Sequence, residues 1–385
     1  MSTPTGAGPL TGIRVIELGG IGPAPYCGML LADQGAELIR LDPVAQHGRR
    51  SHYPVIQRGK KSVAVDLKSA DGVAAVHRLV ATADAVTEGF RPGVAERLGI
   101  GPDQLLSVNP RLVYGRMTGY GQEGPLAQAA GHDVNYLAAT GVLHNTGPAD
   151  GEPVIPLNLV GDMGGGGMLL AFGLTSALLS ARTTGRGQVV DAAMVDGVVS
   201  QLAGLFGPIH RGQWTDGRHP ANAYAGNAPW YAAYRCADGG HMAVGCVEPQ
   251  FWAETLSVLG LGEEPLFARQ HDVAAWPAMK SRMAEVFSAR TRAEWAAAFE
   301  GRETCVSPVL GIAESARHPH HVARRTFVTT ADGSLAPNAA PRFLGTPAPE
   351  PGVAAVVGEH TREVLGDAGL TRAELDALAD RGVIA

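Results

Sequence analysis

The sequence predicts an α/β fold, with a parallel sheet in a large domain and a smaller α+β domain. Three observations lead to this class. Short apolar stretches typical of buried strands alternate with helical stretches through the first half of the chain. A connection rich in Gly, His, Pro and Asn interrupts this pattern at about 207–227. After it, a hairpin-like pair of strands is followed by helices, which is a different order of elements.

The first half of the chain repeats a strand–helix unit. IRVIEL at 13–18 is expected to be a buried strand, followed by a helix over about 24–34 and a second strand, AELIRLD, at 36–42. Such units normally form parallel sheets with right-handed crossovers, so we expect a doubly wound, Rossmann-like arrangement. Further strands are expected at 62–67, 84–90, 111–119 and 188–194.

The domain organisation follows from these shifts in character. We expect the N-terminal part of the large domain at 1–206, a linker at 207–224, and the small α+β domain at 225–325. Residues 326–385 are then expected to return to the large domain with C-terminal helices. The Ser/Thr-x-x-Glu capping pattern marks helix starts at Thr291 and Thr371.

Composition excludes several classes of function. The net charge of −6 leaves no basic footprint, so nucleic acid is not an expected partner. The longest apolar run, 168–181, is too short to span a bilayer, so no membrane insertion is expected. The first residues lack the order of a signal peptide, and four dispersed cysteines without CxxC suggest neither disulfides nor zinc. We therefore expect a cytoplasmic protein without a bound metal.

Three motifs imitate known ligand sites. VIELGGIGPAP resembles a dinucleotide fingerprint, with Asp42 placed for a ribose, but Pro25 stands where the third glycine belongs and Pro23 lacks an N–H. A simple turn at a helix start is the favoured interpretation. The glycines at 164–167 precede no GK[ST], so they are expected to admit a ligand or a facing helix. HPHH at 318–321 has no partner at zinc spacing and is expected to be a surface turn.

The stretch from 131 to 167 carries the candidate chemistry. His132 is expected near a helix start, where the helix dipole favours the neutral, basic imidazole. Asp133 is either a ligand or a helix cap, and the helical NYLAATG that follows favours the cap. Asp162 follows the strand-like PLNLV, before the glycine run and an apolar helix. One imidazole and one carboxylate suit acid–base chemistry from two sides, although a lone histidine is more often structural.

Glu248 is a further candidate, because it follows a predicted strand and precedes Pro249 in VGCVEPQFW. By itself it is equally consistent with a helix-capping acid.

With these residues assembled, the chain resembles the α-methylacyl-CoA racemases within the class III (CaiB/BaiF-type) CoA-transferase family. The resemblance covers the chain nearly end to end. It rests on the segments GPAPYCGMLLADQGAELIRLD, RGKKSVAVDLK, EGFRPGVAERLG, NPRLVYGRMTGYGQEGPLAQAAGHDVNY, PLNLVGDMGGGGMLLAFG, GQVVDAAMVDG, MAVGCVEPQFW and CVSPVLGIAESARHPH.

The resemblance implies inversion of the carbon alpha to a coenzyme A thioester through a planar enolate. It implies no metal or redox cofactor, since CoA is part of the substrate. His132 and Glu248 would serve one face of that carbon and Asp162 the other. An interlocked homodimer is also implied, in which Glu248 comes from either chain.

The resemblance further implies a set of substrate contacts. The thioester end would lie along AGHDVNY, the adenine along the backbone after RGKKS, and a phosphate at Arg91. Pro43 replaces a common phosphate-binding arginine, so Arg40 or Arg49 would have to supply that contact. The implied binding residues are Arg40, Ala64, Val65, Asp66, Leu67, Arg91, Gly131, Asp133, Val134, Asn135 and Tyr136.

Two other functions compete with the racemase. In a CoA-transferase, Asp162 would be a nucleophile that forms a mixed anhydride, but such an enzyme has no need for His132. A catalytically idle acyl-CoA-binding protein would not need all three acid–base residues.

The stretch YAGNAPWY departs from the family's LDGGAPFY at Ala225, Asn227 and Trp230, which leaves open how the substrate tail or a domain hinge is arranged.

Overall fold

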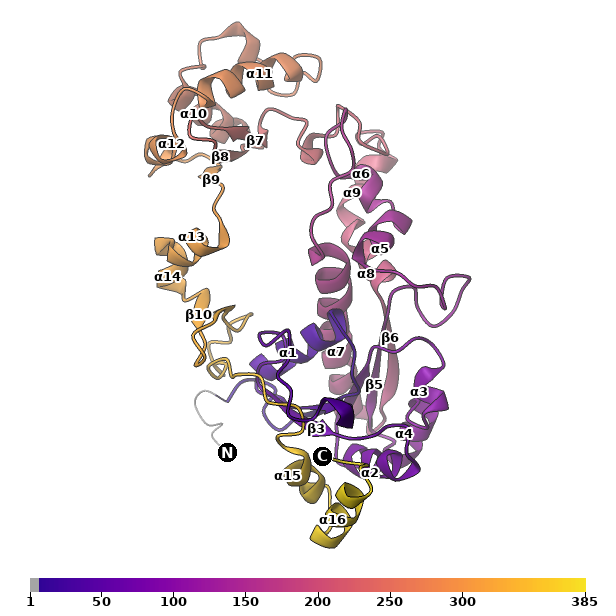
Figure 1. Ribbon diagram of the computed structural model, residues 1–385. Helices are drawn as coiled ribbons and strands as arrows, with labels where there is room; N and C mark the ends of the chain where they lie inside the picture. Colours follow the sequence, from indigo (N-terminus) through magenta and orange to yellow (C-terminus); the bar gives the residue numbers. More distant parts are fainter. Residues whose placement is uncertain (1–6) are drawn as a thin grey trace. The chain divides into compact units, whose positions relative to one another are not determined.

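The computed structural model describes residues 7–385. Its contacts divide the chain into two compact units, coloured by sequence in Figure 1. Unit 1 contains the described residues up to Thr140, together with Pro156–Gln201 and Val322–Ala385. Unit 2 contains Gly141–Ile155 and Leu202–His321. Both units are therefore discontinuous in sequence.

Unit 1 is built on a six-stranded parallel sheet with the order β3-β2-β1-β4-β5-β6. The order reverses between β1 and β4, which is the doubly wound arrangement, and ligands bind such sheets outside the carboxyl ends of the strands at this point. All six strands predicted for this sheet are confirmed, although β3 begins at Lys60, two residues before the expected start at 62. The strands are β1 (Arg14–Glu17), β2 (Glu37–Asp42), β3 (Lys60–Ala64), β4 (Ala85–Glu88), β5 (Val113–Thr118) and β6 (Gln188–Ala193).

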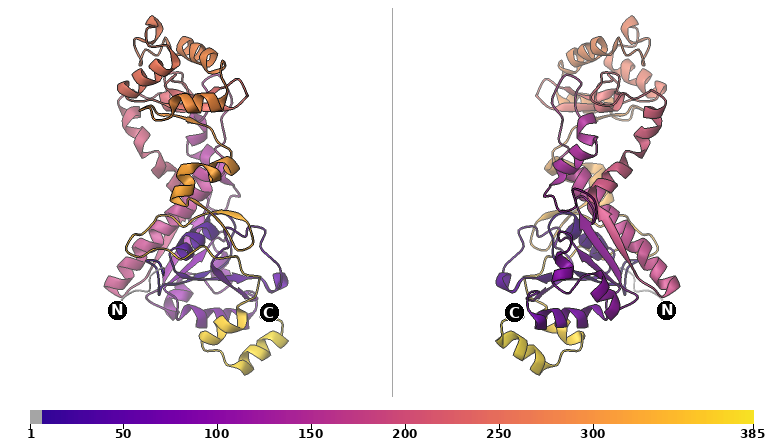
Figure 2. Two further views of the ribbon diagram at one scale, coloured as in Figure 1. Left: turned by 90° about the vertical axis from the view of Figure 1, so that its left-hand side faces the viewer. Right: turned by 90° about the vertical axis from the view of Figure 1, so that its right-hand side faces the viewer.

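Helices cover both faces of this sheet and form two apolar cores. On one face α1 and α7 pack on the strands, with Leu31, Leu170 and Leu174 buried. On the other, α15 lies against β3 and α2, and α16 adds Leu375 to the core (Figures 1 and 2). The helices of this unit include α1 (Pro23–Asp33), α2 (Ala70–Val80), α3 (Val94–Arg97), α4 (Pro102–Val108), α5 (Asp133–Ala139), α7 (Leu169–Thr184), α8 (Met194–Gln201), α15 (Thr361–Asp367) and α16 (Arg372–Asp380). A short hairpin of β10 (Phe327–Thr329) and β11 (Leu335–Pro337) completes it.

The segment before α7 differs from expectation. PLNLV is no strand: Leu159–Met168 form a wide, π-type helix, η2, that continues into α7. The strand interpretation failed because a short apolar run does not by itself distinguish a strand from a buried helix.

The continuous helix Leu159–Thr184 also corrects the expectation that the apolar segment is too short to span a bilayer. It has 26 residues with a mean hydropathy of 1.4, enough by length and composition alone to cross a membrane. One such helix is weak grounds for a membrane span, because core helices pass the same test. Here Leu170, Leu174 and Leu178 are buried against the sheet.

Unit 2 has a three-stranded antiparallel sheet, β7-β8-β9, beside several helices. The predicted hairpin is confirmed, with Asp238 and two glycines in its turn. Its core is aromatic, and Trp252, Phe287 and Trp295 are buried in it. The elements assigned wholly to this unit include α6 (Val142–Asn145), α9 (Ala203–His210), β7 (Tyr231–Arg235), β8 (His241–Gly245), α10 (Pro249–Leu259), α11 (Trp276–Phe287), α12 (Arg292–Phe299), β9 (Val306–Pro308) and α13 (Ile312–Arg317).

Two local predictions can be checked at helix starts. The capping boxes at Thr291 and Thr371 are confirmed, each closed by the glutamate three residues later. The surface turn at 318–321 is wrong, because α14 (Pro319–Arg324) begins there with proline in its first turn. Within residues 7–385, no group of three or more His, Cys, Asp or Glu side chains is arranged to hold a metal.

Candidate active site

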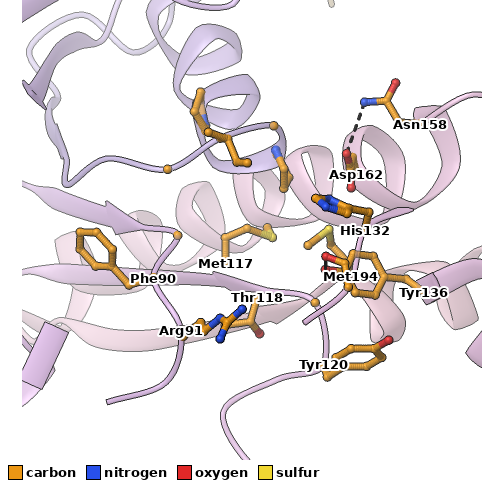
Figure 3. A pocket seen from close by; sticks show the side chains of 18 of the residues that line it. Phe90, Arg91, Met117, Thr118, Tyr120, His132, Tyr136, Asn158, Asp162 and Met194 are labelled. Atoms are coloured by element: carbon orange, nitrogen blue, oxygen red, sulfur yellow. Dashed lines mark hydrogen bonds between the residues drawn. The ribbon is translucent and has the colours of Figure 1, made fainter. Parts of the chain in front are cut away.

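A cavity of about 780 Å³ opens at the carboxyl ends of β1, β4 and β5, where the strand order reverses (Figure 3). Gly20 follows β1, Gly89 follows β4 and Gly119 follows β5, so backbone rather than side chains forms much of the rim. Its position is the one that doubly wound sheets use for ligands. The lining side chains include Ile21, Tyr53, Phe90, Arg91, Met117, Tyr120, His132, Asn135, Tyr136, Asn158, Asp162, Met163 and Met194.

His132 lies at the start of α5, as the sequence indicated. It is the residue that precedes the first turn, and its backbone N–H donates a 3.0 Å hydrogen bond to the Asn135 side chain. This bond fixes the backbone at His132. The imidazole is exposed and lines the cavity (Figure 3).

Asp162 lines the same cavity from the first turn of η2 (Figure 3). Its Oδ2 accepts a 3.3 Å hydrogen bond from the amide of Asn158. Burial raises the pKa of Asp162, and the negative charge of Asp133 raises it further, whereas the Asn158 bond and the His132 imidazole lower it. A half-buried carboxyl of this kind can carry a proton closer to neutral pH than an exposed one.

Asp133 has a different role from the predicted helix cap. The cap position of α5 belongs to His132, and Asp133 is the first residue of the helix. Its side chain is buried, with its Oδ2 accepting a 2.8 Å hydrogen bond from the backbone N–H of Asp162. Asp133 thus joins the two segments that carry the imidazole and the carboxyl.

Tyr136 supports the loop before His132. Its hydroxyl donates a 2.6 Å hydrogen bond to the Gly131 carbonyl, and its ring meets Tyr120 edge-on. Burial, and then the charge of Asp162, raise the pKa of Tyr136 to about 12. The tyrosine therefore stays neutral near pH 7. Of the remaining AGHDVNY residues, Asn135 is exposed at the cavity and Val134 is half-buried outside it.

The glycine run lets helices pack closely rather than forming a turn. A Cβ on Gly165 would lie 2.9 Å from the backbone nitrogen of Val198 in α8, and one on Gly167 would lie 2.7 Å from the carbonyl oxygen of Pro23 in α1. The facing-helix alternative is therefore the one observed. The backbone N–H of Asp162 donates to Asp133 and that of Met163 donates to the Asn158 carbonyl, so neither is free to hold an oxyanion.

The dinucleotide-like motif is a helix start, as favoured above. Gly22 precedes α1 with φ of 66°, and two prolines occupy the first turn. A Cβ on Gly22 would lie 3.5 Å from Oδ2 of Asp162, so this turn passes close to the candidate acid.

The predicted CoA contacts fall in different places. Arg91 is exposed and lines the cavity. Arg40 does not line it: the side chain is buried and its Nε donates to Asp42 at 2.7 Å. Residues 64–67 also lie outside the cavity. The backbone N–H of Asp66 donates to the carbonyl of Val383, and Val65 forms a β-bridge with Ile384. The roles of these residues toward CoA stay predictions.

Glu248 lies in unit 2, immediately before α10. Its side chain is exposed and makes no capping hydrogen bond, so the capping-acid alternative is not what the structure shows. The pairing of Glu248 with His132 stays a prediction.

Sequence reasoning missed several lining residues. Asn158 lies four positions before Asp162, a spacing that brings side chains together on a helix, but the segment had been taken for a strand. Met117, Met163 and Met194 give the cavity a soft apolar wall, and isolated methionines carry no motif that would single them out.

The chain belongs to CoA-transferase family III, whose family model matches residues 10–361. A mouse (Mus musculus) protein named alpha-methylacyl-CoA racemase is 43% identical over 367 residues, which cover 95% of each chain. The human (Homo sapiens) protein of that name is 42% identical over 376 residues, or 97% of each chain. A solved CAIB/BAIF family protein from Brucella suis has a TM-score of 0.82 at 25% identity, covering 94% of this chain and 100% of its own.

Proposed function

We propose that this chain racemises 2-methylacyl-CoA thioesters by moving a proton at the carbon alpha to the thioester. The observation that carries the proposal is that the His132 imidazole and the Asp162 carboxyl line one cavity. Racemisation needs one group that removes the proton and another that returns one to the opposite face. The names of the mouse and human relatives support the same reaction.

In one direction the neutral imidazole of His132 takes the alpha proton, which leaves an enolate and an imidazolium. The protonated Asp162 then delivers a proton to the opposite face of the same carbon. In the reverse direction the Asp162 carboxylate is the base and the imidazolium is the acid. The environment that raises the pKa of Asp162 brings its proton affinity nearer to that of an imidazole, which both directions require.

The enolate oxygen needs hydrogen-bond donors, worth about 3–4 kcal/mol each in acyl-transfer enzymes. The first N–H groups of a helix have no intrahelical acceptor. The N–H of Asp133, directly after His132, is therefore the proposed donor. Glu248, from the same or a partner chain, is proposed to stabilise the imidazolium. We propose no cofactor beyond the CoA of the substrate, since two proton carriers account for the reaction.

The test is incubation of one enantiomer of a 2-methylacyl-CoA in deuterated water. Wild-type protein should scramble the stereocentre and introduce deuterium at the alpha carbon, and H132A should abolish both while it still binds CoA. A wild-type protein that gives no exchange, and instead moves CoA to an added carboxylate, would replace the racemase by a transferase with Asp162 as nucleophile. Unchanged activity after dialysis against a metal chelator tests the cofactor proposal.

We also propose that the chain forms a homodimer. Leu159, Met168, Phe172 and Leu179 lie along the continuous helix Leu159–Thr184 with 57%, 56%, 70% and 68% of their surface exposed. Large apolar patches of this kind are typical of association surfaces. Light scattering should give twice the mass of the chain, and F172E should shift it toward one. A monomeric wild type would contradict the proposal, as would sedimentation of the expressed protein with membranes.

A reducing, cytoplasmic location remains our proposal. All four cysteines are free thiols, and Cys27, Cys236 and Cys246 are buried. Cell fractionation tests this directly.

A further inference from the structure

Asp133 is a buried carboxylate that the reaction above does not use as an acid or a base. Only 5% of its surface is exposed. Its Oδ2 accepts the Asp162 backbone N–H at 2.8 Å, whereas its Oδ1 is buried without a hydrogen-bond partner in residues 7–385. A buried oxygen without a partner costs stability, so a residue of this kind calls for a functional reason.

The segment at Gly161, which packs against Asp133, leaves space for this carboxylate because it has no side chain there. A Cβ built on Gly161 would lie 2.5 Å from Oδ2 of Asp133 and 2.9 Å from its Cγ. Real Cβ atoms do not approach so closely, so only glycine at 161 lets the two segments meet. The carboxylate of Asp133 is thus held against the backbone N–H of Asp162, the catalytic candidate.

We propose that Asp133 is a positioning residue, whose carboxylate anchors the backbone of Asp162 and whose negative charge favours the protonated, proton-donating form of the Asp162 carboxyl. This inference rests on the proposed racemase function and deepens it. It assigns to Asp133 no contact with the reacting carbon. The two carboxyls therefore have different roles: Asp133 holds the backbone of Asp162, and Asp162 exchanges the proton.

The electrostatic surroundings agree with this division. Burial is the main cause that raises the pKa of Asp162, and the Asp133 charge adds to it. From α5, His132 and Tyr136 also interact with the Asp162 charge. From α1 the backbone at Gly22 approaches, and α8 carries the neutral Gln201, which donates to the Val160 carbonyl, together with Asp196.

The test compares D133N with the wild type over pH. Asparagine keeps an oxygen for the Asp162 N–H but removes the charge, so the ionised Asp162 becomes easier to form and its pKa falls. The limb of the pH profile of kcat/KM that follows Asp162 should move to lower pH by on the order of one unit, the usual size of an effect from a neighbouring charge. Titration of the Asp162 carboxyl by NMR, with D162N to assign its signal, identifies that limb. N158D, which adds a negative charge at an exposed side chain beside Asp162, should move the same limb to higher pH.

D191N is the matched control, because Asp191 also accepts a backbone N–H, that of Gln122, but lies outside the cavity lining. Its profile should equal that of the wild type. If D133N does not fold, D133S gives the same test, since serine keeps an acceptor oxygen without the charge. An active neutral variant with an unshifted profile overturns the inference, even if its kcat is reduced. Absence of wild-type exchange would instead refute the proposed function.

Discussion

Gly197 of α8 provides a test of how the helix that carries Asp162 is held. A Cβ at this position would lie 1.9 Å from the carbonyl oxygen of Gly165 and 2.6 Å from its carbon. Both are backbone atoms of η2, so no side chain can rotate away. Ordinary contact begins at 3.4 Å, and in G197A the two helices would therefore have to separate by about 1.5 Å at this point.

The size of the effect follows from this displacement. Overpacking of a closely packed contact typically costs about 1–3 kcal/mol of unfolding free energy. Because η2 also carries Asp162, the proposed proton donor moves relative to His132, and a 1 Å misplacement can lower a rate by about 100-fold. G197A should therefore unfold at lower urea and racemise about 10–100-fold more slowly.

Urea unfolding followed by circular dichroism and deuterium exchange at the alpha carbon are the two assays. The control is G366A in α15, where a Cβ meets no atom within 4 Å, and this variant should gain about 0.5–1 kcal/mol from higher helix propensity. A G197A protein with the wild-type midpoint and the wild-type exchange rate would refute the packing argument.

Three further outcomes are expected. E17Q leaves the buried Lys60 ammonium without its 2.8 Å carboxylate partner and should cost about 3–5 kcal/mol, so an unchanged urea midpoint would contradict it. D162N should raise Tm at pH 7. In the unfolded chain Asp162 ionises around its usual pKa of 3.8, whereas folding raises that pKa, so the stability of the wild type falls as the pH rises above 3.8. Below that pH the two proteins should have the same Tm. Y136F removes the hydroxyl that holds the Gly131 carbonyl and should cost about 0.5–1.5 kcal/mol and lower kcat; wild-type turnover would count against that role.

The parallel sheet could be predicted because the residues that mark a buried strand are close together in the sequence. The stretch AELIRLD at 36–42 carries Leu38, Ile39 and Leu41 within a strand's length and is bounded by glycine and proline, so few other structures suit it. The position of His132 at a helix start was also predictable, since NYLAATG follows it directly. In each case the deciding residues lie within a few positions of each other.

The surroundings of Asp162 were not predictable in this way. Four consecutive glycines lower helix propensity, yet Gly165 and Gly167 are helical because close packing on α8 and α1 outweighs that local cost. Asp133 precedes a helix and therefore suggested a cap, but its partner is 29 residues further along the chain. Contacts of that range depend on the completed fold, which a local pattern does not contain.

The discontinuity of unit 1 has a consequence for synthesis on the ribosome. The last strand of the six-stranded sheet ends at Ala193, but α15 and α16 supply Leu365 and Leu375 to one of its two cores. At ordinary translation rates the nascent sheet waits about 10–40 s for these helices. During that interval one apolar face, including Val63, lacks its final cover, so the growing chain is a natural client for chaperones that bind exposed hydrophobic segments.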